Sequence, residues 1–323
     1  MYLIKFLLMQ KILITDYGFK HIEQEKKLIT GAGFILQTAQ CKTPEEVLTH
    51  GKDAVALLVQ WAPVTAVVID GLKNCRLIVR YGIGVDNIDL QAAKNKGIVV
   101  CNVPDYCIAE VADHTIALAL SLARQLTATH NRTISGEWKI IPPQPVLPFY
   151  EMNFATIGFG RIAREVLKRA APFGFNRMAY DPFVNPEQIK SEGVQPQDFE
   201  TIISRADIIS LHLPLTAQTH HLINAATLNT MKKGAILVNT SRGGLIDTAA
   251  LAEKLNEGAI AAGLDVFERE PLPADHPLMK CKNVILTSHT AWYSEQSVPT
   301  LQFMAAEALV RGLTDGIFKN RVV

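Results

Sequence analysis

The sequence predicts an α/β fold with two parallel-sheet domains, and three observations support this. Short apolar runs rich in Val, Ile and Leu alternate with helical stretches nearly throughout the chain, as expected where helices cover both faces of a parallel sheet. The chain has 323 residues, which is long for one hydrophobic core and sufficient for two. A loose segment with four prolines between positions 142 and 148 interrupts the alternation. We therefore expect two domains of the same class.

The predicted strands are short and mostly β-branched, and polar or turn-forming residues separate them from the helical stretches. In chain order they include Lys11–Thr15, Ala54–Val59, Leu77–Arg80, Ile98–Asn102, Phe154–Ile157, Arg177–Tyr180, Ile208–Leu211, Ala235–Asn239, Ala261–Asp265 and Asn283–Thr287. The first four fall before the loose segment, and the others follow it.

The domain boundary is predicted around a long helix. Glu110–Thr129 is rich in Ala and Leu and contains no Gly or Pro, which favours one continuous helix. The final helix, about Glu295–Asp315, follows the last predicted strand and can return to the first domain. We therefore predict a discontinuous substrate-binding domain, residues 1–108 and 291–323, and a dinucleotide-binding domain, residues 109–290.

Composition excludes several classes of protein. Apolar residues make up 48% and charged residues 20% of the chain, which is ordinary for a globular enzyme. The net charge of +1 gives no general attraction to nucleic acid or membranes.

Five cysteines form no C-x-x-C pair, so we expect reduced thiols in a cytoplasmic protein and no metal site. The apolar start Met1–Gln10 is broken by Lys5 and lacks a cleavage site, so we expect no signal peptide and take Met9 as the natural start.

A glycine-rich turn follows the predicted strand Phe154–Ile157. Gly158, Gly160 and Ala163 form a G-x-G-x-x-A pattern that opens a predicted helix, Arg161–Ala171. Gly158 permits a tight turn, Gly160 lets the backbone approach a pyrophosphate, and the small Ala163 allows close packing of helix on strand. The amide groups at the start of the helix suit phosphate oxygens. This context predicts dinucleotide binding, although a glycine-rich turn alone is weak evidence.

The acidic residue that the pattern requires is also present. The next predicted strand ends at Asp181, about twenty residues on, where a carboxylate can accept the ribose hydroxyls. Pro182 and Phe183 follow, with no Arg or Lys to hold a 2′-phosphate. The sequence therefore predicts NAD in preference to NADP.

Three polar residues follow predicted strands of the second domain, at the sheet edge where ligands bind in such folds. They are Arg242, Glu270 and His289. A histidine can give a proton to the oxygen of a 2-oxo acid and take it back, and a carboxylate beside the ring fixes its tautomer. An arginine matches a substrate carboxylate with its planar fork.

Each of the three residues alone has a structural explanation. A histidine after a strand often serves as a cap, Arg242 can cap the next helix, and Glu270 can be a solvated loop charge. Their joint occurrence behind a cofactor turn favours catalysis.

The matching motifs extend over most of the chain. They are Arg80–Asp89, Val103–Thr115, the Gly158 turn, His212–Thr216 and the segments around Arg242, Glu270 and His289. Because of these motifs, the sequence resembles the D-isomer-specific 2-hydroxy acid dehydrogenases over essentially the whole chain after Met9. Val103–Thr115 and His289–Gln296 look like the branch that includes the C-terminal-binding proteins. Ala155 and Ala163 replace common glycines and Ser288 a usual proline, which we expect to affect packing and loop rigidity.

The resemblance implies two Rossmann-like domains with a cleft between them, the substrate domain being flavodoxin-like, and a homodimer. It implies an NAD-dependent dehydrogenase acting on a small D-2-hydroxy acid or its 2-oxo partner. From the near-neutral net charge we expect no nucleic-acid or membrane partner. The resemblance makes Arg242 the substrate binder, Glu270 the orienter of the imidazole and His289 the acid and base. Further implied contacts are Ile83 and Gly84 with the substrate carboxylate, Trp292 near the substrate, Arg161 and Ile162 on the pyrophosphate, His212 and Pro214 near the adenosine, Thr240 near the nicotinamide, and Asp265 on its amide.

Two other functions remain open at this stage. Enzymes that oxidise 3-phosphoglycerate usually carry an arginine in the loop after the second predicted strand, whereas Val59-Gln60-Trp61-Ala62-Pro63 has no cation and suits a smaller or apolar substrate. An NAD-sensing scaffold like the corepressors is the other alternative. The intact catalytic set and the absence of a disordered composition argue against it.

Overall fold

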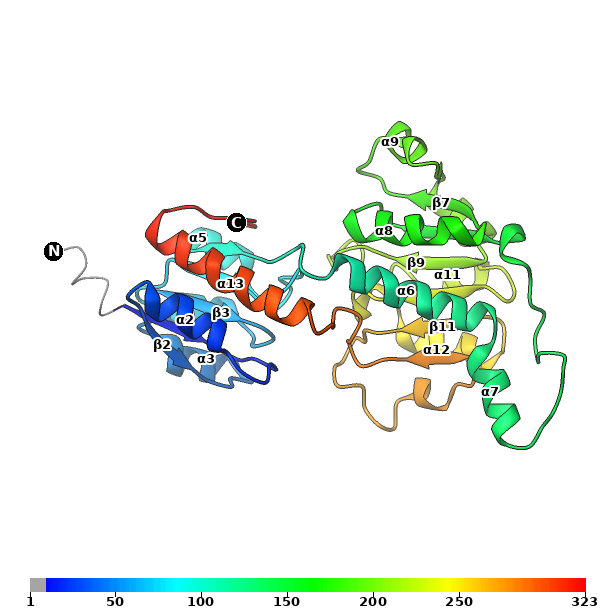
Figure 1. Cartoon of the computed structure of the whole chain (residues 1–323), viewed down its shortest axis with the longest axis horizontal. Helices are drawn as coiled ribbons and strands as arrows, with labels where there is room; N and C mark the ends of the chain where they lie inside the picture. The colour runs from blue at the N-terminus through cyan, green and yellow to red at the C-terminus, as the bar shows by residue number, and fades with distance from the viewer. Residues whose placement is uncertain (1–9) are drawn as a thin grey trace. The chain divides into compact units, whose positions relative to one another are not determined.

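The computed structural model describes residues 10–323, so the apolar start and the proposed Met9 start lie outside the described residues. The chain divides into two compact units. One comprises residues 10–107 together with Tyr293–Val323, and the other is Ile108–Trp292. Each unit is a parallel sheet with helices on both faces, which confirms the predicted α/β class (Figure 1).

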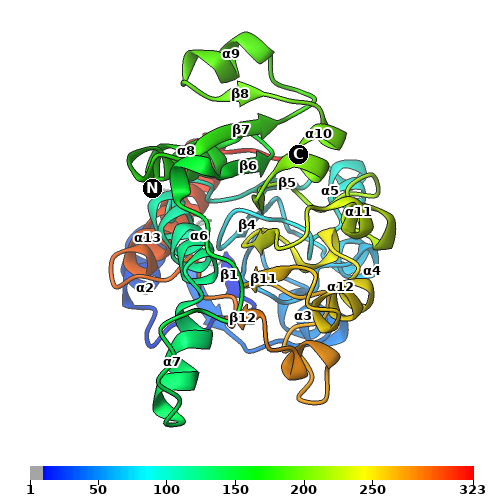
Figure 2. The same ribbon diagram turned by 90° about the vertical axis from the view of Figure 1, so that its right-hand side faces the viewer.

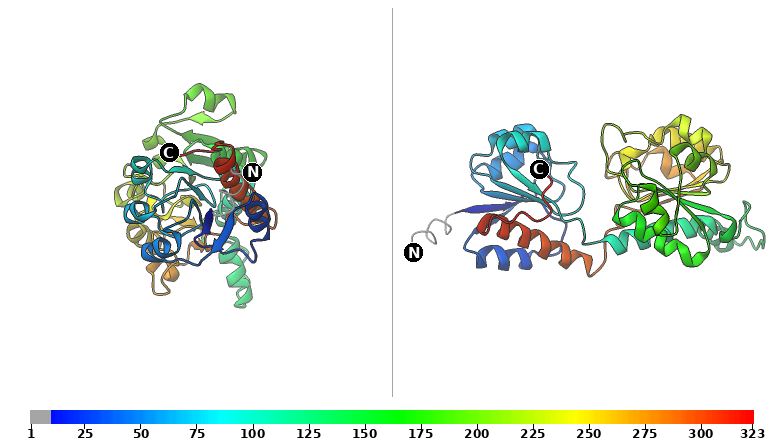
Figure 3. Two further views of the ribbon diagram at one scale, coloured as in Figure 1. Left: turned by 90° about the vertical axis from the view of Figure 1, so that its left-hand side faces the viewer. Right: turned by 90° about the horizontal axis from the view of Figure 1, so that it is seen from above.

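The first unit has a five-stranded parallel sheet in the order β2-β1-β3-β4-β5, a flavodoxin-like order. Helices α2 and α13 pack together on one face, and α3, α4 and α5 follow one another on the other (Figure 3). The elements are β1 (Lys11–Ile14), α2 (Glu23–Gly31), β2 (Ile35–Thr38), α3 (Pro44–Gly51), β3 (Ala56–Val59), α4 (Ala66–Gly71), β4 (Leu77–Arg80), α5 (Leu90–Lys96), β5 (Val99–Cys101) and α13 (Ser297–Thr314).

The second unit has a seven-stranded parallel sheet in the order β12-β11-β10-β9-β6-β7-β8. Helices α6 and α8 pack on one face, and α10, α11 and α12 lie on the other (Figure 2). The elements are α6 (Ile108–Ala123), α7 (Leu126–Ile134), β6 (Asn153–Ile157), α8 (Arg161–Ala170), β7 (Asn176–Tyr180), α9 (Pro186–Ser191), β8 (Gln195–Pro196), α10 (Phe199–Arg205), β9 (Ile208–Leu211), α11 (Ala225–Thr230), β10 (Ile236–Asn239), α12 (Thr248–Asn256), β11 (Ala261–Leu264) and β12 (Val284–Leu286).

In the second sheet, the side to which the chain adds successive strands changes at β6. Strands β7 and β8 lie on one side of β6, and β9 to β12 extend from the other. In open parallel sheets such a switch point is where ligands bind, outside the carboxyl ends of the strands. The turn after β6 contains Gly158, so the predicted cofactor motif stands at the switch point.

The single helix predicted over Glu110–Thr129 is wrong. Two helices, α6 and α7, replace it, and they are separated at Gln125, which has a left-handed backbone (φ 52). The Gln125 side chain donates to the carbonyl of Gln144 (2.7 Å) and accepts the amide of the same residue (3.1 Å). These bonds hold the break in place. Among the described residues, no helix is both long and apolar enough to cross a membrane.

Candidate active site

The turn after β6 is shaped by its first glycine. Gly158 has φ +101, and its amide donates to the carbonyl of Tyr180 (2.7 Å). A β-carbon at this position would lie 2.3 Å from the carbonyl oxygen of His212, so only glycine fits. Gly160 is the N-cap of α8, and a β-carbon there would meet nothing within 4 Å. The open space at the start of a helix fits a pyrophosphate.

Asp181 lies directly after β7 and borders the same turn. Its carboxylate accepts the amide N–H groups of Phe159 (2.8 Å) and Phe183 (2.9 Å). Arg161 is exposed at the start of α8, and Ile162 is half-buried against the core. Asp181 thus borders the turn, and Arg161 and Ile162 open the helix that follows it, where a dinucleotide's ribose and phosphates would lie.

Other predicted cofactor residues follow the neighbouring strands. After β9, His212 Nε2 lies 2.8 Å from Ser210 Oγ, and burial lowers the pKa of the imidazole to about 3, so the ring is neutral. Pro214 is exposed two residues later. After β10, Thr240 Oγ1 lies 2.9 Å from Thr115 Oγ1 on α6. All of them lie beyond the carboxyl ends of parallel strands, at one edge of the sheet.

The structure pairs the predicted acid–base residues. His289 Nδ1 lies 2.7 Å from Glu270 Oε2, and Glu270 Oε1 accepts the amide of Phe267 (2.9 Å). Burial raises the pKa of Glu270, but the hydrogen bond and charge of His289, the Phe267 amide and the charge of Arg242 together bring it below its usual value. An ionised carboxylate on Nδ1 leaves Nε2 as the atom that exchanges a proton with a substrate.

The loop that carries Arg242 lies against the loop that carries Glu270. A β-carbon at Gly243 would lie 1.9 Å from the carbonyl carbon of Phe267, so the two backbones touch. Asn239, at the end of β10, fixes the start of the loop, since its side-chain Nδ2 donates to the carbonyl of Arg242 (2.8 Å). The three predicted catalytic side chains thus come from adjacent loops after β10, β11 and β12.

Asp265 positions the loop that carries His289. This role was not predicted from the sequence. The Asp265 carboxylate is completely buried and accepts the amide groups of Thr290 (2.9 Å) and Ala291 (2.9 Å). Its carbonyl accepts the amide of His289 (2.8 Å), which has a left-handed backbone (φ 55). The resemblance indicated Asp265 only as a contact of the cofactor. No local signal reveals bonds across more than twenty residues.

A second group behind this loop was also missed. Thr287 Oγ1 donates to Asp265 Oδ1 (2.6 Å), and His114 Nε2 on α6 lies 3.0 Å from the same hydroxyl. The sequence motif around His114 identified the family but gave this side chain no role.

The predicted substrate loop Ile83–Gly84 lies after β4 in the first unit. Asn102 donates to the carbonyl of Ile83 (2.6 Å), and Gly82, with φ +131, accepts the amide of Val103 (2.9 Å). Trp292 is half-buried at the end of the second unit. Contacts of these residues with a substrate stay predictions.

Comparison with known proteins gives a family match that contains the cofactor turn and the three predicted catalytic residues. Residues 116–291 match the family described as "D-isomer specific 2-hydroxyacid dehydrogenase, NAD binding domain". The chain belongs to the D-isomer specific 2-hydroxyacid dehydrogenase family. The family description and the names of the relatives support NAD-dependent oxidoreduction of 2-hydroxy acids, in agreement with the predicted enzyme class and cofactor.

Three relatives illustrate the similarity. Hydroxypyruvate reductase of Thermotoga maritima is 43% identical, over 70% of this chain and 74% of that protein. D-3-phosphoglycerate dehydrogenase of Methanocaldococcus jannaschii is 40% identical over 97% of this chain, which spans only 59% of that protein. The structure of D-lactate dehydrogenase from Aquifex aeolicus, complexed with NAD and lactic acid, matches with a TM-score of 0.88 and 28% identity, over 97% of this chain and 99% of that chain.

Proposed function

We propose that this dehydrogenase reduces a small, unphosphorylated 2-oxo acid, such as hydroxypyruvate or glyoxylate, to the D-2-hydroxy acid with NADH. The observation that carries the proposal is a buried carboxylate beneath the loop after β3. Asp16 is 5% exposed, and its two oxygens accept the amide groups of Gln60 (3.1 Å) and Trp61 (2.6 Å).

This arrangement is unfavourable for a phosphate. Backbone amides and cations are the groups that hold phosphate oxygens, and here the amides of Gln60 and Trp61 already bind a carboxylate of the same sign as the phosphate. The Gln60 side chain is buried and accepts the amide of Gly18 (2.8 Å). Bringing an unpaired phosphate against such a loop would cost several kcal/mol of lost hydration, to order of magnitude.

The contact between His289 and Glu270 supports the catalytic roles that we propose. Nε2 of His289 gives a proton to the carbonyl oxygen of the substrate, and Glu270 holds the ring through Nδ1 and stabilises the imidazolium. Arg242 binds the substrate carboxylate. Bound NADH supplies the hydride. We also assign the amides of Ile83 and Gly84 to the carboxylate, and Trp292 to the side chain of the substrate.

The cofactor contacts are part of the same proposal. Gly158 and Gly160 let the backbone approach the pyrophosphate, with Arg161 and Ile162 beside it, and Asp181 accepts the ribose hydroxyls. The other assigned contacts are His212 and Pro214 at the adenosine, Thr240 near the nicotinamide, and Asp265 on its amide.

Steady-state kinetics on matched substrates test the substrate class. We expect hydroxypyruvate to have a kcat/KM at least about tenfold above that of phosphohydroxypyruvate, because an unpaired phosphate costs more than the 1.4 kcal/mol that tenfold represents. Trp61→Arg, which adds a cation at an exposed position of the loop, should raise kcat/KM for the phosphorylated compound, and Trp61→Gln should not. A higher value for phosphohydroxypyruvate in the unmodified enzyme would establish a phosphoglycerate dehydrogenase. Absence of turnover with every 2-oxo acid would favour the scaffold.

A homodimer is proposed from an exposed apolar surface on α7 and the segment after it. Ile134, Trp138, Ile140 and Ile141 are between 70% and 91% exposed. Large apolar side chains exposed together within one short segment often mark an interface, here with a second copy of the chain. Sedimentation equilibrium should give a dimer for the natural sequence and a monomer for Trp138→Ser with Ile140→Ser. A monomer before substitution contradicts the proposal.

We further propose that the enzyme acts in the cytoplasm. All five cysteines lie within the described residues, three of them buried, and they form no disulfide there, as expected for a reducing compartment. Cell fractionation with an antibody to the chain tests this, and recovery in a membrane or secreted fraction contradicts it.

A further inference from the structure

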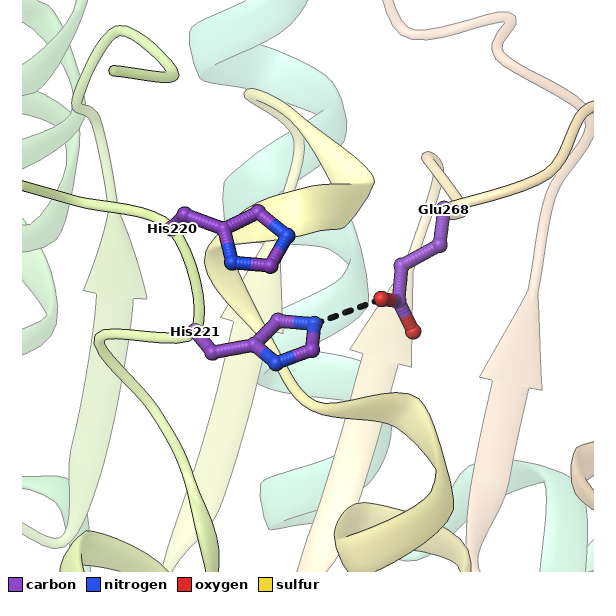
Figure 4. A group of neighbouring side chains, drawn as sticks. All are labelled: His220, His221 and Glu268. Carbon is purple, nitrogen blue, oxygen red and sulfur yellow. Dashed lines mark hydrogen bonds and ion pairs between the residues drawn. The ribbon is translucent and has the colours of Figure 1, made fainter. Parts of the chain in front are cut away.

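Two neighbouring histidines and a glutamate form a cluster on the second unit. Figure 4 shows His220 and His221, from the loop after β9, with their rings stacked, and Glu268, from the loop after β11, beside the ring of His221. The ring centroids lie 3.9 Å apart with 22° between their planes. His221 Nε2 is 2.6 Å from Glu268 Oε1, and one ligand atom from each residue lies within 4.8 Å of the others.

The backbone holds His221 in a conformation that non-glycine residues rarely adopt (φ 50). Its amide donates to the carbonyl of Gly244 (2.8 Å), and the Asn224 side chain donates to its carbonyl (3.2 Å). Backbone of this kind persists where the surroundings fix it, and it is frequent at functional sites. Its effect here is that the ring of His221 faces Glu268.

Glu268 is oriented as well. Its Oε2 accepts the amide of Thr248, the first residue of α12 (3.1 Å), so its Oε1 is the oxygen at His221. The side chains of His221 and Glu268 are each 34% exposed, and His220 is exposed, so solvent ions reach all three.

We propose that His220, His221 and Glu268 bind a divalent ion of the zinc type. Two imidazoles and one carboxylate are a donor set for Zn²⁺, Co²⁺, Ni²⁺ and Cu²⁺, whereas Mg²⁺ prefers oxygen donors alone. The ion replaces the proton between His221 and Glu268, the exposed ring of His220 turns to supply the second nitrogen, and water completes the coordination. The bound ion then links the loop after β9 to the loop after β11, which carries both Glu268 and Glu270.

Metal titrations of the full chain, without cofactor, test the site. Visible absorption follows Co²⁺ binding, and competition with a chromophoric chelator follows Zn²⁺. We expect one ion per chain. His220→Asn, His221→Asn and Glu268→Gln should each weaken binding at least about tenfold, because even the loss of an outer-shell partner of a metal ligand costs that much. Asparagine tolerates the left-handed backbone at 221, and glutamine keeps an acceptor for the Thr248 amide.

Matched controls separate this site from adventitious binding. His130→Asn removes an exposed histidine of α7, and Cys281→Ser removes a partly exposed thiol, so both should bind Co²⁺ as the natural sequence does. Mg²⁺ should not displace Co²⁺. Binding that none of the three cluster substitutions weakens overturns the proposal, and so does the absence of Co²⁺ and Zn²⁺ binding in the micromolar range. Neither readout depends on turnover, so the proposed function stands or falls separately.

Discussion

The two glycines of the cofactor turn have different roles, and alanine substitutions separate them. At Gly158, φ is +101 and an added β-carbon would lie 2.3 Å from the His212 carbonyl oxygen. Backbone strain of this kind costs on the order of 1–3 kcal/mol, and the clash adds to it, so Gly158→Ala should destabilise the second unit by about 3 kcal/mol. For a domain of this size, that loss lowers Tm by roughly 6–12 °C.

Gly160→Ala tests the cofactor contact alone. Gly160 has φ −72 and nothing within 4 Å of an added β-carbon, so the fold should tolerate the methyl group. The open space is where a pyrophosphate approaches the backbone. A methyl group there should weaken NADH binding at least about tenfold, or about 1.4 kcal/mol.

Thermal unfolding and fluorescence titration with NADH measure the two effects. Gly31→Ala in α2 is the matched control, because a β-carbon there also meets nothing within 4 Å, so NADH affinity should stay unchanged and Tm should not fall. An NADH affinity like that of the natural sequence in Gly160→Ala would refute the assigned backbone approach. An unchanged Tm in Gly158→Ala would refute the steric argument.

Three further outcomes are expected. His289→Gln should lower kcat by on the order of a hundredfold with an unchanged Kd for NADH, measured by steady-state kinetics and fluorescence, and near-normal turnover removes it from the mechanism. Asp181→Ser with Phe183→Arg should move the kcat/KM ratio towards NADPH, and equal use of both cofactors by the natural sequence contradicts the role of Asp181. The pKa of His212 is about 3 in the fold and ordinary when unfolded, so the unfolded chain binds more protons and stability falls as pH falls below 6.5. His212→Asn should remove up to about 2 kcal/mol of that loss between pH 6.5 and 5 in urea unfolding, and an unchanged slope contradicts it.

The elements predicted from sequence are those whose signal is local. The strand before Gly158 is a buried apolar run, and its turn requires a glycine, so both could be recognised. Strand β2 was not among the predicted strands because it is an edge strand with partly exposed side chains. The helix break at Gln125 depends on bonds to Gln144, nineteen residues later, so helix propensity gave no sign of it.

The same distinction holds for the site. His289 and Glu270 could be named because their residue types follow predicted strands, and the structure places them in contact. The anchoring of the histidine loop by Asp265 depends on folded backbone geometry, which residue spacing does not encode. The metal cluster joins residues 47 positions apart, so no ligand spacing exists in the sequence to detect.

The acid–base pair, the arginine and the cofactor turn all come from one uninterrupted stretch of chain, Ile108–Trp292. Only the flanking segments, 10–107 and 293–323, build the other unit. A chimera that joins this central stretch to the flanks of a relative therefore needs just two junctions, after Cys107 and before Tyr293. Such recombinants should inherit coenzyme choice, proton chemistry and the assigned contacts of Arg242 and Trp292 unchanged, while the loop after β3 and the Ile83–Gly84 loop come from the relative. A change in substrate preference can then be traced to these two loops.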